Sequence, residues 1–182
     1  MDIYQILITY NPMWSWREIL CFGVVAALTL FVLIRAVRHG RVQIVQAIAL
    51  MMFLTFLAIV FESTVFTRTT ITRQAEWIPF WSWHAIIRYH DMELLKEDLL
   101  NCLLLFPAGV LLPFIVNQRI RPKVAFFVGF LISLGIESCQ LIFARGLFEW
   151  DDMIHNALGC MFGCILVDVL WRCYKKVKFG KK

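Results

Sequence analysis

The sequence predicts an all-α fold: a polytopic membrane helix bundle with about five transmembrane helices. Hydrophobic residues occupy 60% of the 182 positions, charged residues occupy 17%, and the mean hydropathy is +0.72. Soluble domains carry about a quarter charged residues and roughly half apolar ones. A soluble enzyme, a disordered regulator and a nucleic-acid-binding domain are therefore poor fits, and we expect a compact bundle whose main partner is the lipid bilayer.

Five stretches are long and apolar enough to cross the hydrocarbon core, which requires about 20 helical residues. The first could instead be a cleaved signal peptide. Its leading segment is not basic, however, and no small-residue cleavage site follows it, so we expect a retained helix. The predicted spans are residues 19–37, 42–61, 99–116, 124–144 and 153–171.

The connections between the spans define the predicted organisation. Only the basic turn 35–41 separates the first two spans, so they should form a tight hairpin. In the third span, Pro107 lacks an N–H and frees the carbonyl of Leu103, which predicts a kink. We expect Pro107 and Gly109 to serve helix packing. The predicted parts are an N-terminal helix with its basic turn (1–41), a membrane core (42–171) that contains an exterior loop (62–98), and a basic tail (172–182).

The exterior loop contains an aromatic stretch at residues 77–83 that is too short to span a bilayer and too apolar to remain in water. We expect this stretch to lie at the outer headgroup boundary. His84 and His90 belong to the same loop and lack the spacing of metal ligands, so we interpret them as interfacial residues.

The placement of charge predicts that the N-terminus is outside and the C-terminus is cytoplasmic. Most of the 18 basic residues lie in the turn after the first span, in the loop after the third span and in the tail, with only Asp168 as an acid nearby. Lys and Arg accumulate on the cytoplasmic side of membrane proteins. We expect the tail to contact anionic inner-leaflet lipids and not nucleic acid.

The six cysteines indicate neither a disulfide framework nor a metal site. Five of them lie within predicted spans, and Cys173 lies in the tail. Cys160 and Cys164 are four residues apart, but no second pair or suitably spaced His accompanies them, and buried Cys usually behaves as a small hydrophobe. The sequence predicts no metal and no cofactor.

One face of the fourth span carries polar side chains. Ser133, Glu137 and Gln140 follow a spacing of i, i+4 and i+7, which places them on the same side of a helix. A charge inside a bilayer costs about 2.5–3.5 kcal/mol, so Glu137 is the most informative single residue. Arg145 follows near the outer interface, where it could pair with the Glu137 carboxylate.

The fifth span has a matching face formed by Asp152, Asn156, Gly159 and Gly163. The two glycines would allow close approach of another backbone, and we expect the fourth and fifth spans to pack through these faces. Alternatively, the glycines serve packing alone, Asp152 only caps its helix, and Glu137 is structural. The predicted ligand-binding pocket comprises Ser133, Glu137, Gln140, Arg145, Glu149, Asp151, Asp152, Asn156 and Asn101.

These residues, in this order, resemble the signature of VanZ-like membrane proteins. The signature reads approximately S-x-x-x-E-x-x-Q, an Arg, a D-x-D-D element, and N-x-x-G followed by a further Gly. Residues 78–80 and 101–109 resemble two upstream motifs of the family. Glu149 replaces the more usual Asp, and Trp150 replaces an aliphatic residue, so the acidic and apolar characters are retained.

The resemblance implies a bacterial plasma-membrane protein, and the family's namesake is associated with resistance to the glycopeptide teicoplanin. The leading interpretation is a cell-envelope protein whose outward-facing pocket binds a lipid-linked cell-wall precursor or a lipoglycopeptide, thereby modulating glycopeptide susceptibility. The alternative is an intramembrane enzyme that acts on a lipid-linked substrate, with Glu137 or Asp152 as the candidate catalytic acid or base.

Other functions fit the sequence less well. The enzyme is disfavoured because no nucleophile–base pair, P-loop or HExxH motif is present. A transporter requires a water-accessible path, for which five helices offer little room. A metal held by Glu149, Asp151 and Asp152 is disfavoured because contiguous acids outside a ligating loop are usually solvated. The sequence specifies no oligomeric state.

An impermeant thiol reagent applied to intact cells tests the predicted topology. Cys173 lies in the tail that we expect to be cytoplasmic, so it should resist labelling until the cells are permeabilised. A cysteine introduced by Asp91→Cys should react in intact cells. The opposite labelling pattern would show that the chain is inserted the other way round.

Overall fold

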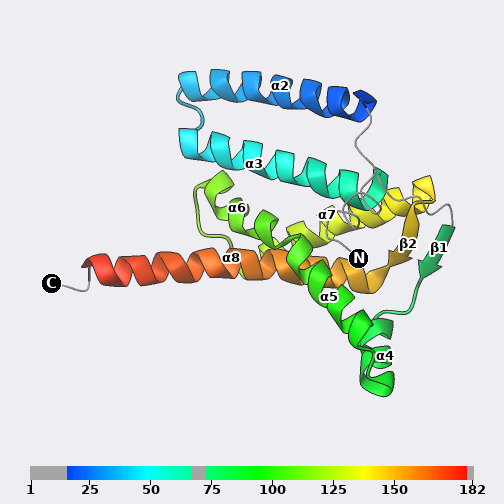
Figure 1. The fold of residues 1–182 in the computed structure, drawn as a ribbon. Helices are drawn as coiled ribbons and strands as arrows, with labels where there is room; N and C mark the ends of the chain where they lie inside the picture. Colours follow the sequence, from blue (N-terminus) through cyan, green and yellow to red (C-terminus); the bar gives the residue numbers. More distant parts are fainter. Residues whose placement is uncertain (1–15, 67–72, 180–182) are drawn as a thin grey trace, which may run out of the picture. The chain divides into compact units, whose positions relative to one another are not determined.

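The computed structural model describes residues 16–66 and 73–179 (Figure 1), and the chain divides into two compact units. The first unit contains residues up to Trp77 together with Leu134–Glu149, and the second contains Ile78–Ser133 together with the segment from Trp150 onward. The boundary between Ser133 and Leu134 falls inside helix α7 (Pro122–Phe143). Parts of the predicted N-terminal segment, exterior loop and tail, namely residues 1–15, 67–72 and 180–182, lie outside the described residues.

In the first unit, α2 (Trp16–Arg38) and α3 (Ile44–Phe61) form the predicted antiparallel hairpin (Figure 1). The turn between them includes Gly40 at φ +67°, a left-handed conformation that glycine adopts without steric cost. The Gln46 side chain accepts a hydrogen bond from the Gln43 N–H at 3.0 Å, so the polar residues at the start of this span cap its helix.

The second span extends further than predicted, because α3 continues into a π-helical turn, η1 (Glu62–Phe66). The hydroxyl groups of Ser63 and Thr64 donate to the Val60 carbonyl at 3.0 and 2.7 Å. These side-chain bonds satisfy both hydroxyls within the helix itself. Glu62 is the first residue of this π-helical turn, and only 1% of its surface is exposed.

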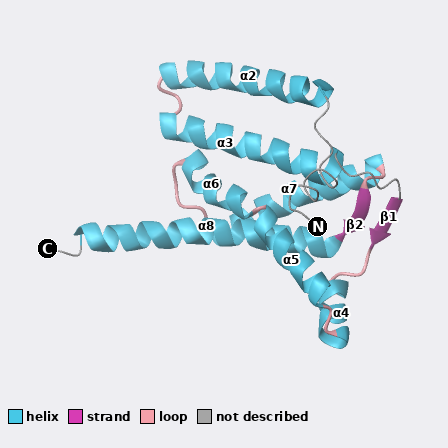
Figure 2. Ribbon diagram, in the orientation of Figure 1, coloured by secondary structure: helices cyan, strands magenta, loops and turns pink. Residues whose placement is uncertain are grey.

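Two short strands, β1 (Arg73–Glu76) and β2 (Gly146–Glu149), form a parallel two-stranded sheet in the first unit (Figure 2). The ring of Phe148 in β2 lies 5.3 Å from that of Trp77, the residue that follows β1. This sheet was not predicted, because four-residue runs are too short to show the alternation of polar and apolar residues that identifies a strand.

The second unit contains α4 (Trp81–Tyr89), α5 (Met92–Leu104), α6 (Phe106–Val116), the first half of α7 and α8 (Trp150–Phe179). The predicted third span corresponds to α5 and α6, which are interrupted at Leu105, and Pro107 lies in the first turn of α6. The interruption agrees with the kink expected from the missing proline N–H. The segment begins at Met92 and not at 99, because the Asp91 side chain caps α5 by accepting from the Glu93 and Leu94 N–H groups at 3.1 Å.

The prediction that Gly159 and Gly163 face the fourth span was wrong. Helices α5 and α6 pack against α8 (Figure 1), and their backbones supply the nearest neighbours of the two glycines. A Cβ atom on Gly159 would overlap the carbonyl oxygen of Cys102, and one on Gly163 would overlap that of Phe106. Glycines at i and i+4 identify the face of a helix that another backbone can approach. They carry no information about which neighbouring helix supplies that backbone.

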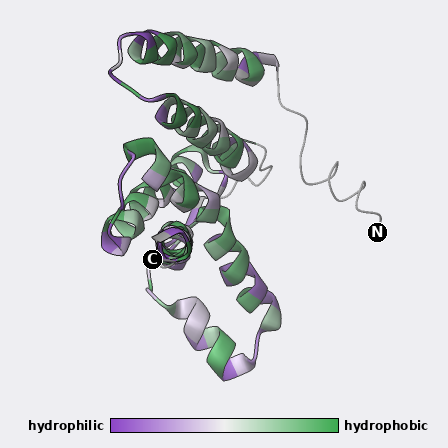
Figure 3. Cartoon of the chain, turned by 90° about the vertical axis from the view of Figure 1, so that its left-hand side faces the viewer, coloured by the Kyte–Doolittle hydropathy of each residue, from purple (hydrophilic) through white to green (hydrophobic). Residues whose placement is uncertain are grey.

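The prediction of five membrane spans is confirmed, and the protein is a multi-pass membrane protein by the length and apolar character of these helices. Large apolar side chains are exposed along α2 and α3, and Figure 3 colours both helices predominantly as hydrophobic. Helices that are hydrophobic all round are typical of lipid-facing spans. The five segments are Ile19–Arg38, Ile44–Phe66, Met92–Val116, Pro122–Phe143 and Trp150–Lys178.

We predict that Gly159→Ala lowers the thermal stability of the detergent-solubilised protein. The added methyl group would force the α8 backbone away from Cys102, and such overpacking costs about 1–3 kcal/mol. Gly23→Ala is the matched control, because a Cβ atom there meets no atom within 4 Å, and alanine favours a helix over glycine by about 1 kcal/mol. Equal melting temperatures for the two variants would contradict close packing at Gly159.

Candidate functional site

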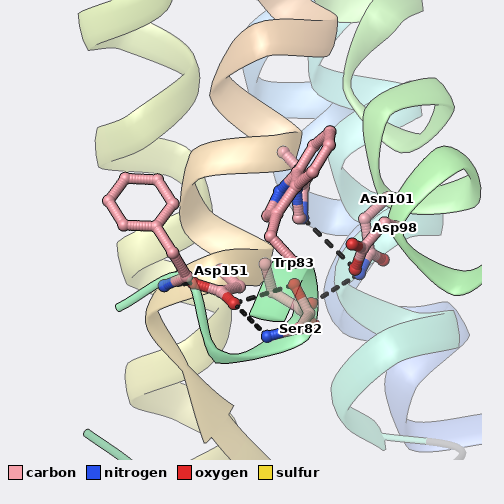
Figure 4. Close-up of polar contacts among 8 residues, drawn as sticks. Ser82, Trp83, Asp98, Asn101 and Asp151 are labelled. Atoms are coloured by element: carbon pink, nitrogen blue, oxygen red, sulfur yellow. Dashed lines mark hydrogen bonds and ion pairs between the residues drawn. The ribbon is translucent and has the colours of Figure 1, made fainter. Parts of the chain in front are cut away.

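Polar side chains from α4, α5 and α8 converge within the second unit (Figure 4). Helical spacing explains the contribution of α8, since Asp151 and His155 are four residues apart and therefore share a face. The same spacing relates Asp152 to Asn156 on the adjacent face. We call this group the α4–α5–α8 cluster, and it consists of Ser82, Trp83, Asp98, Asn101, Asp151, Asp152, His155 and Asn156.

Asp151 holds the N-terminus of α4. Its carboxylate accepts hydrogen bonds from the Phe80 N–H, from the Ser82 N–H at 2.9 Å and from the Ser82 hydroxyl at 2.8 Å. Phe80 has a left-handed backbone conformation at φ +63° and provides no side-chain cap of its own. The carboxylate from α8 therefore replaces the missing cap, and its charge is favourable at the positive end of the α4 dipole.

His155 lies between Trp83 and Asp98 and is almost fully buried. The Trp83 indole N–H donates to His155 Nε2 at 2.8 Å. Because Nε2 accepts this bond, the neutral imidazole carries its proton on Nδ1. That atom lies 3.5 Å from the Asp98 carboxylate, so the acid and the ring are arranged as a pair.

Three buried atoms of the cluster lack a hydrogen-bond partner among the described residues: Asp98 Oδ2, His155 Nδ1 and Asn156 Oδ1. Leaving a buried polar atom unpaired costs about 1–3 kcal/mol, so such atoms are uncommon in folded proteins. Asn156 Oδ1 is an amide oxygen and can only accept a hydrogen bond. Asp98 Oδ2 is likewise only an acceptor while the carboxyl group is ionised. The cluster can therefore accept hydrogen bonds from a donor-rich group.

Two further bonds connect α8 to its neighbours within the unit. Asn101 of α5 donates from its amide to the Asp152 carboxylate. Asn156 donates to the Ser133 hydroxyl on α7 at 2.8 Å. Asp152 therefore lies in the first turn of α8 and also contacts Asn101, a predicted pocket residue from another span.

The first unit contains the other predicted pocket residues. Glu137 is buried, and its Oε2 accepts a hydrogen bond from the Glu149 N–H at 3.2 Å, so the acid in α7 contacts the end of strand β2. Gln140 is also buried and donates to the Thr64 carbonyl in η1 at 3.2 Å. The Arg145 N–H donates to the Gln140 carbonyl at 2.8 Å, which closes the end of α7.

The predicted pocket residues are thus divided between the two units. Each unit brings some of its own members together, as Glu137 with Glu149 in the first and Asn101 with Asp152 in the second. The grouping of Glu137 with Asp152 and Asn156 stays a prediction. All six cysteines are free, and no metal-binding group of three or more His, Cys, Asp or Glu side chains occurs within residues 16–66 and 73–179.

Sequence reasoning missed Ser82, Trp83, Asp98 and His155 as site residues. A signal for Asp98 existed, because Asp91 followed by Glu93 is typical of a helix start and would have placed Asp98 and Asn101 on one face of the third span. Ser82 and His155 had no comparable signal, since their roles depend on partners about 70 residues away along the chain.

A family model described as VanZ/LLP1 matches residues 44–171, which is well over half of the chain. The chain belongs to the VanZ/LLP1 family. The match confirms the resemblance seen in the sequence. Comparisons with curated proteins and with solved structures gave no match for this VanZ/LLP1 protein.

The matched region of this VanZ/LLP1 protein begins at the first residue of α3 and ends within α8. It includes every residue of the α4–α5–α8 cluster and the four predicted pocket residues of the first unit. Helix α2 lies before it. The cluster is therefore built from the part of the chain that defines the family membership.

We predict that Asp151→Asn loosens α4. An NH₂ group would replace one acceptor oxygen and would face the N–H groups of Phe80 and Ser82, which are also donors. Leaving a buried donor unpaired costs about 1–3 kcal/mol. Hydrogen exchange over residues 81–89 should accelerate and the melting temperature should fall. Glu93→Gln is the control, because Glu93 is exposed in a surface pair with Lys96 and should be nearly neutral. Unchanged exchange in Asp151→Asn would contradict the capping role.

Proposed function

We propose that this VanZ/LLP1 protein binds the polar headgroup of an outer-leaflet amphiphile at the α4–α5–α8 cluster. The observation that carries the proposal is the position of Trp83. Its indole N–H donates to buried His155, whereas 45% of its residue surface is exposed. A buried polar cluster behind a partly exposed aromatic ring suits a ligand that is polar at one end and apolar at the other.

The exposed face of α4 supports an amphiphilic ligand. Trp83 and Ile87 are four residues apart on α4, and Phe80 directly precedes the helix. Phe80 and Ile87 are 58% and 72% exposed. Short helices with an aromatic, apolar face lie in the membrane interface. In our proposal, this face contacts acyl chains at the outer headgroup boundary, and the polar end of the ligand reaches the cluster from there.

The charges of the cluster favour a ligand rich in hydrogen-bond donors. Asp98, Asp151 and Asp152 supply three carboxylates, and His155 is the only basic side chain in the cluster. A phosphate would be repelled by these acids, whereas sugar hydroxyls, amide N–H groups or an ammonium group would be accepted. The glycan or peptide part of a lipid-linked cell-wall precursor meets this requirement, and so does a lipoglycopeptide such as teicoplanin.

Within the site we assign different roles to the acids. The hydrogen bonds that Asp151 accepts come from Ser82 in α4 and from Phe80 directly before it, so we propose that Asp151 positions α4 and does not contact the ligand. Asp98 and Asn156 have buried oxygens available to accept ligand bonds. We propose that these two residues make the direct contacts, together with Asp152.

The Asp98–His155 pair also favours a second candidate, an enzyme acting on a lipid-linked substrate. If a substrate hydroxyl replaced the Trp83 N–H at Nε2, His155 could take up its proton while Asp98 stabilised the resulting imidazolium. This arrangement assigns the acid–base chemistry to His155 and Asp98, where the sequence had suggested Glu137 or Asp152.

Binding of labelled teicoplanin and of a labelled lipid-linked cell-wall precursor to the purified protein in nanodiscs tests the proposal. We predict that Asp98→Asn weakens binding of at least one probe about ten-fold or more, because a hydrogen bond to a charged group contributes about 1.5–3 kcal/mol. Glu97→Gln is the matched control, since Glu97 is exposed on the same helix and loses the same charge.

Three outcomes are decisive in this experiment. Unchanged affinity of both probes in Asp98→Asn, at normal abundance, would refute the binding site. Reduced abundance together with unchanged affinity would identify a purely structural cluster. Conversion of the precursor to a product by the wild-type protein, lost in His155→Gln, would establish the enzyme in place of the binding protein.

A further inference from the structure

A basic pocket lies at the opposite end of α8 from the α4–α5–α8 cluster, within the second unit. Its volume is about 320 Å³. Arg119 comes from the connection between α6 and α7, and the other lining residues come from the last turns of α8. The lining residues are Arg119, Trp171, Arg172, Lys175 and Lys176.

Asp168 holds the two arginines in place. One carboxylate oxygen pairs with Arg119 Nε, and the other pairs with Arg172 Nη2 at 2.6 Å. A guanidinium group has five N–H donors, so each arginine keeps donors beyond the one that faces Asp168. A single acid therefore orients two guanidinium groups and neutralises only one of the four positive charges around the pocket.

We propose that this pocket binds the phosphate group of an anionic phospholipid. Oriented guanidinium groups and lysine ammonium groups are the side chains that recognise phosphate, by paired hydrogen bonds and by charge. Because Asp168 fixes the arginines in advance, less side-chain entropy is lost on binding. The excess of positive charge excludes the donor-rich, cationic ligands that suit the acidic cluster at the other end of α8.

The apolar surroundings favour a lipid over a soluble phosphate. Trp171 lines the pocket and packs edge-on against Phe114 at 6.1 Å, and tryptophan is typical of the membrane interface. Val169, Leu170 and Tyr174 are exposed on the neighbouring turns of α8. These side chains offer a surface for acyl chains beside the basic pocket. One lipid molecule would therefore place its phosphate in the pocket and its acyl chains on this surface.

The test uses the full-length protein in detergent after removal of bound lipid. Phosphatidylglycerol, phosphatidylcholine and inorganic phosphate are titrated separately, and binding is followed by native mass spectrometry and by the melting temperature. We expect phosphatidylglycerol to bind and to raise the melting temperature, with phosphatidylcholine and inorganic phosphate at least ten-fold weaker. Equal binding of phosphatidylcholine, or full competition by inorganic phosphate at matched concentration, would overturn the assignment to an anionic lipid.

Two double variants locate the site. Lys175→Gln with Lys176→Gln leaves the Asp168–arginine contacts intact and should weaken phosphatidylglycerol binding about ten-fold or more. Arg38→Gln with Arg41→Gln removes the same charge from the end of α2 and from the turn that follows it, and should retain wild-type affinity. Equal losses in both variants would indicate general surface charge, and no loss in the lysine variant would exclude the pocket.

Discussion

The hydrogen bonds between Asp151 and the start of α4 are the interaction on which the candidate site depends. A nine-residue helix has little stability of its own, and α4 has no capping side chain. The buried carboxylate supplies that cap from α8 and fixes the direction in which α4 leaves the preceding chain. This cap also positions Trp83 for its hydrogen bond to His155, because Trp83 directly follows the residue that Asp151 binds.

Close backbone packing is the second requirement of the site. Asn101 and Cys102 are consecutive residues of α5, and a Cβ atom on Gly159 would overlap the Cys102 carbonyl. The same approach of α5 to α8 brings the Asn101 amide to the Asp152 carboxylate. In a bilayer, polar groups must find partners within the protein, so small residues that permit close approach determine which polar side chains can meet.

The sequence predicted the features that depend on local composition. Apolar runs predicted the five spans, the basic turn predicted the hairpin of α2 and α3, and Pro107 predicted the break between α5 and α6. It could not predict features that depend on a distant partner. The glycines identified a close-packing face without its neighbour, and His155 became a candidate only when Trp83 and Asp98 were seen beside it.

The length of α8 relates the two proposed binding sites to each other. Its 30 residues span about 45 Å, whereas the hydrocarbon core of a bilayer is about 30 Å thick. A membrane-spanning helix of this length is therefore long enough to reach the headgroup level at both ends. Acids occupy its first turn and basic residues occupy its last turn, as the helix dipole favours. The acidic cluster and the basic pocket would then face opposite interfaces, so a donor-rich headgroup and an anionic phosphate could bind to one helix without competing.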